Sequence, residues 1–360
     1  MIDIDELDIV FLMAINEYLK RRGHLCVVPF VGLTISPTGN IDLCCNTTDY
    51  SLGHISKIED LASFYNGAKY NEVREIFEGG KTGDLKGCKD CYTDYINGSV
   101  NYAFHRSNHV KNSYRDIFDA DWKSRTEGEA IPIRFLEYTC SNTCNQSCST
   151  CTSFYSSKWA QIEKQFTEYE KKKYSRSINA SIKLTDRDVE KILKILPHLK
   201  KISIKGGEPW VDKNNTRVLN YLLESNPYCN IEIISNMQSL GKNNSNTIKK
   251  FKDHKGWVEL CASIDGVGEE YEWIRSSPFE TTVETMEEFY RLSGRKIGIS
   301  VCISVFNFFS LHKIVSFFKD KEYIDRIDMT NPAGIHSYYR FANLPRDIVS
   351  GHLERYKKFF

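Results

Sequence analysis

From residue 132 onward, short apolar runs alternate with amphipathic segments. Apolar runs bounded by turn residues are typical of buried strands, and apolar residues three or four apart are typical of helices that pack on a sheet. The pattern predicts strands at 132–138, 200–204, 230–234, 257–264, 297–305 and 325–329, and helices at 155–173, 185–196, 214–225, 244–253, 280–293 and 309–320. This alternation predicts an α/β fold, a parallel sheet curled into a partial (β/α)6 TIM-like barrel with ligands at the carboxyl ends of its strands.

The N-terminal part of the chain has a different pattern. Apolar residues at helical spacing predict a helix over residues 5–22. Extended segments at 32–36 and 40–43 flank a turn that contains Gly39, and together they predict a β-hairpin. A further helix is predicted over 58–77. We therefore expect a small α+β domain before the barrel.

The length of the chain, 360 residues, favours one large domain and one smaller domain. Residues 104–131 are polar and lack periodicity, which is typical of a connection between domains. The predicted organisation is an N-terminal helix at 1–25, an auxiliary domain at 26–103, the connection at 104–131, the barrel at 132–335 and a C-terminal extension at 336–360.

Composition and charge give no support for nucleic acid or membranes as partners. Hydrophobic residues make up 41% of the chain and charged residues 26%, which is ordinary for a soluble protein. The formal net charge of +1 gives no electrostatic argument for nucleic acid or for acidic membranes. No apolar run approaches the ~18–20 residues that span a bilayer, and the stretch from Met1 to Glu6 is acidic where a signal peptide would be basic. We expect a cytoplasmic protein.

Twelve cysteines in such a chain require an explanation. In a reducing compartment, clustered cysteines more often bind metal than form disulfides. Cys229, Cys261 and Cys302 stand singly in apolar, strand-like surroundings, and we interpret them as thiols of the core. The other nine lie between residues 26 and 151.

Three of these nine, Cys144, Cys148 and Cys151, follow the first predicted barrel strand in the pattern C-x3-C-x2-C. A loop of this kind directs three sulfurs at one centre and leaves a fourth corner open. That arrangement suits an iron–sulfur cluster that binds a small molecule, because four protein thiolates would saturate it. The alternative at this point is three reduced cysteines in a loop.

A second group of cysteines lies in the auxiliary domain. The predicted hairpin brings Cys26 towards Cys44 or Cys45, and Cys88 and Cys91 form a C-x2-C pair downstream. Four thiolates complete the coordination of one metal centre. Zinc and a [4Fe–4S] cluster both fit this number of ligands, and the spacing does not separate them.

Polar and glycine-rich motifs follow the later barrel strands. Adjacent glycines let the backbone approach a ligand closely, and a neighbouring carboxylate can accept an ammonium group. Short polar side chains and an acid suit ribose hydroxyls, and an arginine can bind a carboxylate. The residues concerned are Gly206, Gly207, Glu208, Pro209, Ser235, Asn236, Ser263, Asp265 and Arg275.

In its order of motifs the chain resembles the radical S-adenosylmethionine (SAM) superfamily, and within it the enzymes with a twitch domain, a shortened SPASM domain. The sequence from Cys144 to Cys151 is similar to the cluster loop of that superfamily, and Ser156-Ser157-Lys158-Trp159 resembles the stretch that follows the loop. The spacing Cys26-x12-Gly39-x4-Cys44, followed by a C-x2-C pair, resembles the auxiliary-cluster pattern.

The resemblance implies a role for each motif. Cys144, Cys148 and Cys151 would hold a SAM-binding [4Fe–4S] cluster, and Cys26, Cys44, Cys88 and Cys91 a second, auxiliary [4Fe–4S] cluster. Residues 206–209 would bind the methionine amine of SAM. Residues 235–236 and 263–266 would contact its carboxylate and ribose.

The chain also departs from that superfamily. Thr150 stands where many members have an aromatic residue before the third cluster cysteine, and the auxiliary domain precedes the barrel instead of following it. Cys45 competes with Cys44 as a ligand. Cys140 adds a fourth cysteine ahead of the loop, and we interpret it as a non-ligand because only the last three have the spacing of the superfamily.

The implied activity is reductive cleavage of SAM to a 5′-deoxyadenosyl radical that abstracts hydrogen from a substrate. A second cluster favours a net oxidation or a crosslink of a peptide or a small molecule. The implied partners are that substrate and an electron donor such as flavodoxin or ferredoxin. The alternative is a non-catalytic adaptor that binds zinc or an iron–sulfur cluster on a degenerate barrel.

Overall fold

The structure, a computed structural model, describes residues 26, 28–44, 47, 50–96, 130–170, 183–330 and 339–359. The predicted helix over 5–22, most of the predicted connection at 104–131, and Cys45 lie outside the described residues. The chain divides into two compact units. The first comprises Met1–Glu137 and Glu190–Ile202, and the second Tyr138–Val189 and Ser203–Phe360.

The first unit contains the predicted hairpin. β1 (Gly32–Ile35) and β2 (Asn40–Asp42) pair antiparallel, and β3 (Ser51–His54) pairs antiparallel with β2. Gly39 has a φ of +83°, a conformation that glycine adopts without steric cost, and its N–H donates to the carbonyl of Ser36 at 2.9 Å. The prediction of a hairpin with a glycine-containing turn is confirmed.

The helix predicted over 58–77 is instead two helices, α3 (Leu61–Tyr65) and α4 (Ala68–Glu78). Asn66 separates them because its side chain bonds to main-chain groups outside the helix. Its Nδ2 donates to the carbonyl of Ile131 at 3.0 Å, and its Oδ1 accepts from the N–H of Ile131 at 2.6 Å. Asparagine followed by glycine, here Asn66 and Gly67, is a helix-stop signal, but the apolar spacing continues across it and predicted one helix.

The remaining elements of the first unit are short. They are α2 (Val28–Val31), η1 (Ile55–Lys57), η2 (Thr82–Asp84), η3 (Lys86–Cys88) and α5 (Lys89–Ile96). The core of this unit is built on apolar residues of the hairpin and of α3 and α4, each at most 1% exposed: Leu33, Ile35, Ile41, Tyr65, Tyr70, Val73 and Phe77.

The strands predicted for the barrel are all present. They are β4 (Phe135–Tyr138), β5 (Lys201–Ile204), β6 (Asn230–Ser235), β7 (Val258–Ser263), β8 (Ile297–Cys302) and β9 (Ile324–Thr330). β4 and β5 each carry residues of both units. In the second unit the strands follow the order β5-β6-β7-β8-β9 with parallel pairing from β6 to β9, and the sheet does not close. The predicted open α/β architecture is confirmed.

The helices that follow these strands largely match the predicted ones. They are α8 (Ser157–Glu163), α10 (Asp186–Ile195), η4 (Leu196–His198), α11 (Lys213–Ser225), α12 (Ser245–Lys249), η5 (Lys250–Lys252), α14 (Phe279–Ser293) and α15 (Leu311–Phe318). The pattern did not predict α13 (Glu269–Arg275), η7 (Phe341–Asn343) or α16 (Arg346–Phe359).

α8 is shorter than the helix predicted over 155–173. A new turn begins at Thr167, whose main-chain N–H and hydroxyl both donate to Glu170 Oε2, at 2.7 and 2.8 Å. A threonine with a glutamate three residues later forms a capping box, which favours a helix start at that point over continuation of α8.

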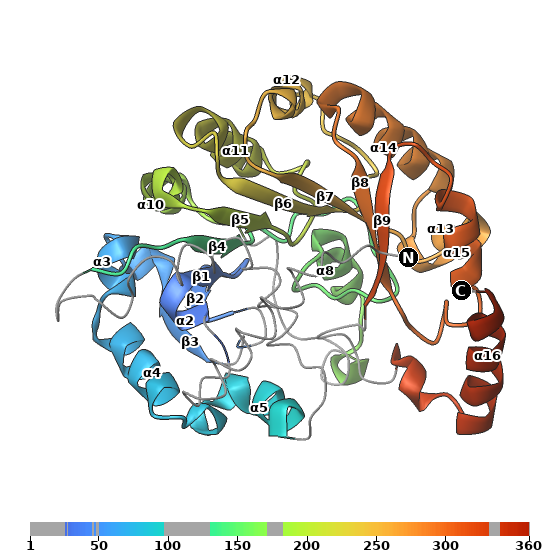
Figure 1. The fold of residues 1–360 in the computed structure, drawn as a ribbon, viewed down its shortest axis with the longest axis horizontal. Coiled ribbons are helices and arrows are strands. Elements are labelled where there is room, and N and C mark those ends of the chain that lie inside the picture. Colours follow the sequence, from blue (N-terminus) through green and yellow to red (C-terminus); the bar gives the residue numbers. More distant parts are fainter. Residues whose placement is uncertain are drawn as a thin grey trace. The chain divides into compact units, whose positions relative to one another are not determined.

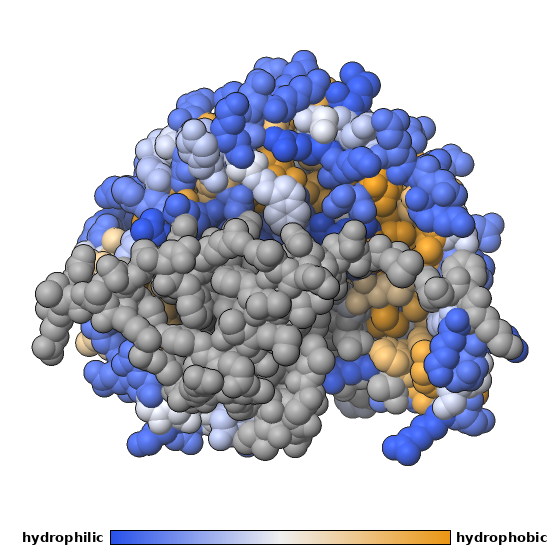
Figure 2. Space-filling model, in the orientation of Figure 1, coloured by the Kyte–Doolittle hydropathy of each residue, from blue (hydrophilic) through white to orange (hydrophobic). Residues whose placement is uncertain are grey.

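The two faces of the sheet in the second unit differ in polarity. Alternate residues such as Ile233, Leu260 and Ile299 are fully buried, and α11, α12 and α14 lie together on one face (Figure 1). The surface over these helices is mostly hydrophilic (Figure 2). No helix among the described residues is long and apolar enough to cross a membrane.

Two glutamates stand at alternate positions of β6 and β7. Ligand atoms of Glu232, Glu259 and Cys261 lie within 4.8 Å of one another, which is close enough for a metal ion. The guanidinium of Arg326 forms an ion pair with Glu259, and its Nη2 lies 3.7 Å from the sulfur of Cys261. A fixed positive charge at this distance opposes a second cation, so we interpret the group as an ion pair and not as a metal site.

Candidate functional site

The loop with three cysteines begins after β4 and is held by the start of α8. Ser156 caps α8 and donates its hydroxyl to the carbonyl of Gln146 at 2.6 Å. The hydroxyl of Ser157 accepts from the N–H of Cys144 at 3.1 Å, and Trp159 Nε1 donates to the carbonyl of Cys148 at 2.7 Å. The stretch from Ser156 to Trp159 therefore fixes the backbone on which two of the cysteines stand.

α13 holds the other side of the same loop. The N–H of Ser149 donates to the carbonyl of Ile274 at 2.7 Å, and the hydroxyl of Ser276 donates to the carbonyl of Ser147 at 3.0 Å. Ser276 has a φ of +53°, which is uncommon for a residue with a side chain. No local pattern predicted this contact, because it joins the cysteine loop to a helix that the apolar spacing did not predict.

Cys148 is buried, and Cys144 and Cys151 are half-buried. Burial raises the pKa of Cys144 to about 11, and burial likewise raises the pKa of Cys148 and of Cys151. None of the three forms a disulfide. Buried thiols on one short loop need a positively charged partner to be held as thiolates, and the irons of a cluster are such a partner. The donor set therefore fits the predicted cluster.

The glycine motif after β5 contacts the cysteine loop directly. Gly206 and Gly207 have φ values of +75° and +52°. A Cβ atom at Gly207 would lie 2.3 Å from the carbonyl oxygen of Thr143, the residue before the first cluster cysteine. The N–H of Glu208 donates to that same oxygen at 2.7 Å. Glycine is needed here because the two loops approach backbone to backbone.

Glu208 is a buried carboxylate, 1% exposed, that joins two strand ends. Its Oε1 accepts from the hydroxyl of Ser235 at 2.8 Å, and its Oε2 accepts from the N–H of Asn236 at 2.7 Å. Burial raises its pKa to about 7, and these hydrogen bonds oppose the rise. A carboxylate accepts about four hydrogen bonds, so Glu208 retains capacity for a cationic ligand group.

Asn236 connects the end of β6 to the cysteine loop. Its Nδ2 donates to Asn145 Oδ1 at 2.7 Å and lies 3.8 Å from the sulfur of Cys144. The structure thus brings together the end of β5, the end of β6 and the cysteine loop, as the sequence predicted. Pro209 contributes through its carbonyl, which accepts from Asn215 Nδ2 at 3.1 Å.

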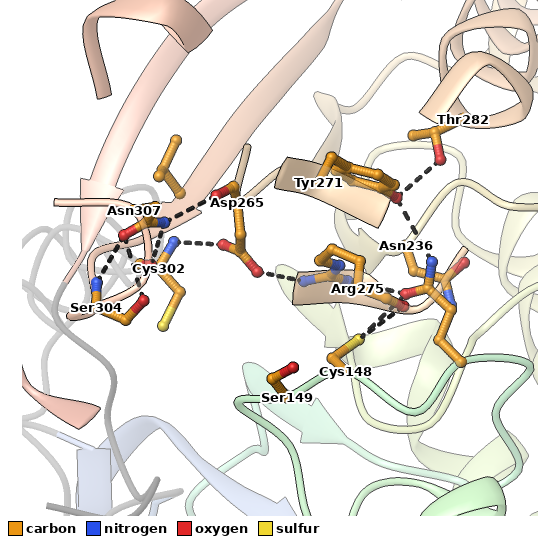
Figure 3. Close-up of polar contacts among 12 residues, drawn as sticks. Cys148, Ser149, Asn236, Asp265, Tyr271, Arg275, Thr282, Cys302, Ser304 and Asn307 are labelled. Carbon is orange, nitrogen blue, oxygen red and sulfur yellow. Dashed lines mark hydrogen bonds and ion pairs between the residues drawn. The ribbon is translucent and has the colours of Figure 1, made fainter. Parts of the chain in front are cut away.

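Asp265 and Arg275, which the sequence assigned separately to ribose and carboxylate, form an ion pair with each other (Figure 3). Arg275 Nη1 lies 2.9 Å from Asp265 Oδ2, and the N–H of Cys302 donates to Asp265 Oδ1 at 2.8 Å. Arg275 Nε is buried and has no partner among the described residues. Ser263 stands half-buried at the end of β7, opposite Ser300 of β8.

Three residues that sequence reasoning missed complete this network, and two of them, Tyr271 and Thr282, are seen in Figure 3. Gln146 lies within the cysteine loop, and its Oε1 accepts from Arg275 Nη2 at 3.3 Å. Its Nε2 lies 3.5 Å from the hydroxyl of Tyr271, which in turn lies 2.8 Å from the hydroxyl of Thr282 in α14. Only Gln146 had a sequence signal, its place between two cluster cysteines.

Cys140 and Cys302 differ in their surroundings. Cys140 is fully buried, and burial raises its pKa to about 12. Its interpretation as a non-ligand stays a prediction. Cys302 was expected in the core but is half-buried at the end of β8, next to Asp265. Cys229 and Cys261 are buried as expected.

In the first unit, the structure brings the end of the hairpin to the C-x2-C pair. The hydroxyl of Thr47 donates to the carbonyl of Cys44 at 2.8 Å. A Cβ atom at Gly87, the residue before Cys88, would lie 2.6 Å from Cγ2 of Thr47. Cys91 follows in the first turn of α5. These contacts bring the segments of Cys44 and Cys88 together, as four-thiolate coordination requires.

Comparison with known families supports an iron–sulfur centre in the auxiliary domain. Residues 26–92 match the SPASM family, an iron–sulfur cluster-binding domain. The matched range contains all four predicted auxiliary ligands, Cys26, Cys44, Cys88 and Cys91. This part of the chain is therefore an iron–sulfur cluster-binding domain of the SPASM type. The match favours iron–sulfur over zinc as the metal centre of this domain.

Several solved structures have a distant likeness to the chain. SuiB of Streptococcus suis bound to S-adenosylmethionine has 13% identity and a TM-score of 0.44, over 91% of this chain and 69% of that one. SuiB bound to its precursor peptide SuiA has 15% identity and a TM-score of 0.42, over 91% and 70%. The anSMEcpe protein with bound AdoMet has 18% identity and a TM-score of 0.41, over 56% and 52%. The search of curated proteins found no match.

Proposed function

We propose that this protein is a radical SAM enzyme in which the loop from Cys144 to Cys151 holds the SAM-binding [4Fe–4S] cluster and the SPASM-type domain holds a second one. One observation carries the proposal. Glu208 and Asn236, from two strand ends predicted to bind SAM, are bonded to the loop that carries the three cysteines. A buried carboxylate, a half-buried arginine and three thiols then surround one place at the carboxyl end of the sheet.

Different residues of the chain would bind different parts of SAM. Glu208 would accept the ammonium group of SAM, and Arg275, through its unpaired Nε, would donate to the carboxylate. Ser235, Asn236, Ser263 and Asp265 would orient the amino-acid and ribose parts. The chemistry supplied by such a cluster is one-electron reduction of the sulfonium, which yields methionine and a 5′-deoxyadenosyl radical.

The net reaction would be an oxidation or a crosslink of a peptide or a small molecule. A second cluster supports this reading, because it can accept the electron that a substrate radical gives up. Flavodoxin or ferredoxin would supply the first electron, and a reducing compartment such as the cytoplasm would keep seven cysteine ligands free of disulfides. The alternative function, a non-catalytic metal-binding adaptor, gives Glu208 and the glycine motif no role.

The test is anaerobic reconstitution followed by iron analysis and by assay of SAM cleavage with dithionite. We expect about eight irons per chain and formation of 5′-deoxyadenosine, whereas a zinc adaptor would hold one or two zincs. Cys144→Ala should lower the iron content to about four per chain and abolish 5′-deoxyadenosine. Cys229→Ala, which changes a thiol outside both ligand sets, is the control. A Cys144→Ala protein that cleaves SAM like wild type would refute the proposal.

The pH dependence of SAM binding tests the role of Glu208. Because its pKa is raised from 4.5 to about 7, the ligand-free chain loses stability as pH rises through that interval. The ammonium of SAM needs the ionised carboxylate, so SAM affinity should fall as pH drops below about 7.

Glu208→Gln should weaken SAM binding about tenfold above pH 7 and remove this part of the pH dependence. The measurement is calorimetric titration of the reconstituted protein at several pH values. An identical profile in wild type and variant would contradict the role of Glu208.

A further inference from the structure

Three aromatic rings form a ladder at the carboxyl end of the strands in the second unit. Trp273 of α13 packs edge-on against Phe306, which follows β8, with ring centroids 5.1 Å apart. Phe306 packs in turn against Tyr339, with centroids 4.8 Å apart. The N–H of Val305 donates to the carbonyl of Tyr339 at 2.9 Å and fixes the second pair. We refer to Trp273, Phe306 and Tyr339 as the aromatic ladder.

The first ring of the ladder faces the solvent. Trp273 is 62% exposed, although tryptophan buries more apolar surface than any other side chain when it enters a core. Phe306 and Tyr339 are partly exposed behind it. An indole that packs on one ring, which a second ring supports in turn, and that remains open to water has the character of a binding hot spot.

The ladder lies next to the cysteine loop. The hydroxyl of Ser149 donates to the carbonyl of Trp273 at 3.4 Å, and the N–H of Ser149 donates to the next carbonyl, that of Ile274. On the other side, Asn307 adjoins Phe306, and its Nδ2 donates to the carbonyl of Asp265 at 3.0 Å (Figure 3). The ladder is therefore fastened to the same loop and strand end as the proposed SAM site.

The surroundings of Trp273 are acidic. Glu269 lies one helical turn before Trp273, on the same face of α13, and is exposed. Glu272 is exposed as well. The single base of α13, Arg275, is paired with Asp265 and does not neutralise them. An indole face beside exposed carboxylates attracts a cationic group both through the ring and through charge.

The size of the ladder favours an extended chain over a compact ligand. Its two centroid separations span at most about 10 Å. An extended polypeptide rises ~3.3 Å per residue, so the ladder matches a run of about three residues. Pockets for small molecules are concave and enclose most of the ligand, whereas Trp273 is open.

We propose that the aromatic ladder and Glu269 form the docking surface for a polypeptide substrate, and that they hold a segment with a lysine or arginine side chain. The inference rests on the proposed function and names the substrate class of that site. The cationic side chain would lie on the indole of Trp273 with Glu269 as its counter-ion, and the backbone of the segment would run along Phe306 and Tyr339 towards the cysteine loop.

The experiment uses the full chain, reconstituted anaerobically, and two short fluorescein-labelled peptides. In one, lysine and phenylalanine alternate with glycine; in the other, glutamate replaces lysine. Fluorescence anisotropy measures the dissociation constants. We expect the lysine peptide to bind at least tenfold more tightly than the glutamate peptide, to within about a factor of two. Rising ionic strength should weaken the binding of the lysine peptide.

The variants locate the surface. Trp273→Ala should weaken binding of the lysine peptide about tenfold. Glu269→Lys should also weaken binding of the lysine peptide, and it should reduce the ratio between the affinities for the lysine and the glutamate peptide. Tyr228→Ala is the matched control, because Tyr228 is 74% exposed and precedes β6, at the opposite end of the strands. It should bind the lysine peptide as wild type does.

Equal binding of the two peptides by wild type would overturn the inference, and so would wild-type affinity for the lysine peptide in Trp273→Ala. Weaker SAM binding with unchanged peptide binding in Trp273→Ala would also overturn it and would assign the ladder to the adenine instead. SAM cleavage by wild type, measured in the same preparation, separates this failure from failure of the proposed function.

Discussion

Replacing Gly207 with alanine is expected to abolish SAM cleavage. The added Cβ would lie 2.3 Å from the carbonyl oxygen of Thr143 and 3.0 Å from that of Ser141, and both are backbone atoms that cannot rotate away. The cysteine loop or the glycine motif must shift. A displacement of about 1 Å at a reacting centre can cost about a hundredfold in rate, so 5′-deoxyadenosine formation should fall at least that far.

Gly294→Ala is the matched control for this prediction. Gly294 also has a positive φ, +64°, but its nearest neighbour would be Cγ of Lys252 at 3.9 Å, an ordinary contact. It should lose only about 1 kcal/mol of stability from backbone strain and retain SAM cleavage. If both variants lose activity equally, strain and not the approach of the two loops explains the need for glycine.

Replacing Arg74 with methionine is expected to destabilise the SPASM-type domain by about 2–4 kcal/mol. The side chain is 5% exposed, and its Nε and Nη2 donate to the carbonyls of Pro29 and Tyr65 at 3.0 and 2.8 Å. The guanidinium carbon lies 4.4 Å from the ring centroid of Tyr65 and 5.4 Å from that of Tyr70. Methionine keeps most of the volume and removes every one of these polar contacts.

Denaturation with urea, followed by circular dichroism and iron analysis, measures this effect. Arg291→Met is the control, because Arg291 is 72% exposed and should change the free energy of unfolding by less than about 0.5 kcal/mol. We expect Arg74→Met to lose iron from the auxiliary cluster as well, since α4 packs in the same core as the hairpin. Equal unfolding midpoints for the two variants would contradict this account of Arg74.

Local patterns explain why much of the fold was predictable. Each barrel strand is a short apolar run between turn residues, and the hairpin has glycine where its turn needs a positive φ, so both features are encoded by neighbours in sequence. The prediction of one continuous helix over 58–77 was wrong because the bond between Asn66 and Ile131 joins residues far apart in the chain. Apolar spacing carries no information about such a partner.

For the candidate site, too, local spacing predicted one part and missed another. Sequence spacing was sufficient to single out the three-cysteine loop and to place the glycine motif and Ser235–Asn236 at the same end of the sheet, because parallel strands end together. It assigned Asp265 and Arg275 to separate parts of a ligand, yet they bond each other. Their pairing depends on α13, which the pattern did not predict.

Residue types at short, fixed spacing were enough to predict the order of the barrel strands, the three cysteines of the loop and a cysteine-bound metal centre in the auxiliary domain. The contact of Gly207 with Thr143, the contact of Gln146 with Arg275, and the exposure of Trp273 next to the cysteine loop became visible in the folded chain alone. These are contacts between segments distant in the chain, and they arise from how the strand ends and α13 pack, which no local pattern encodes.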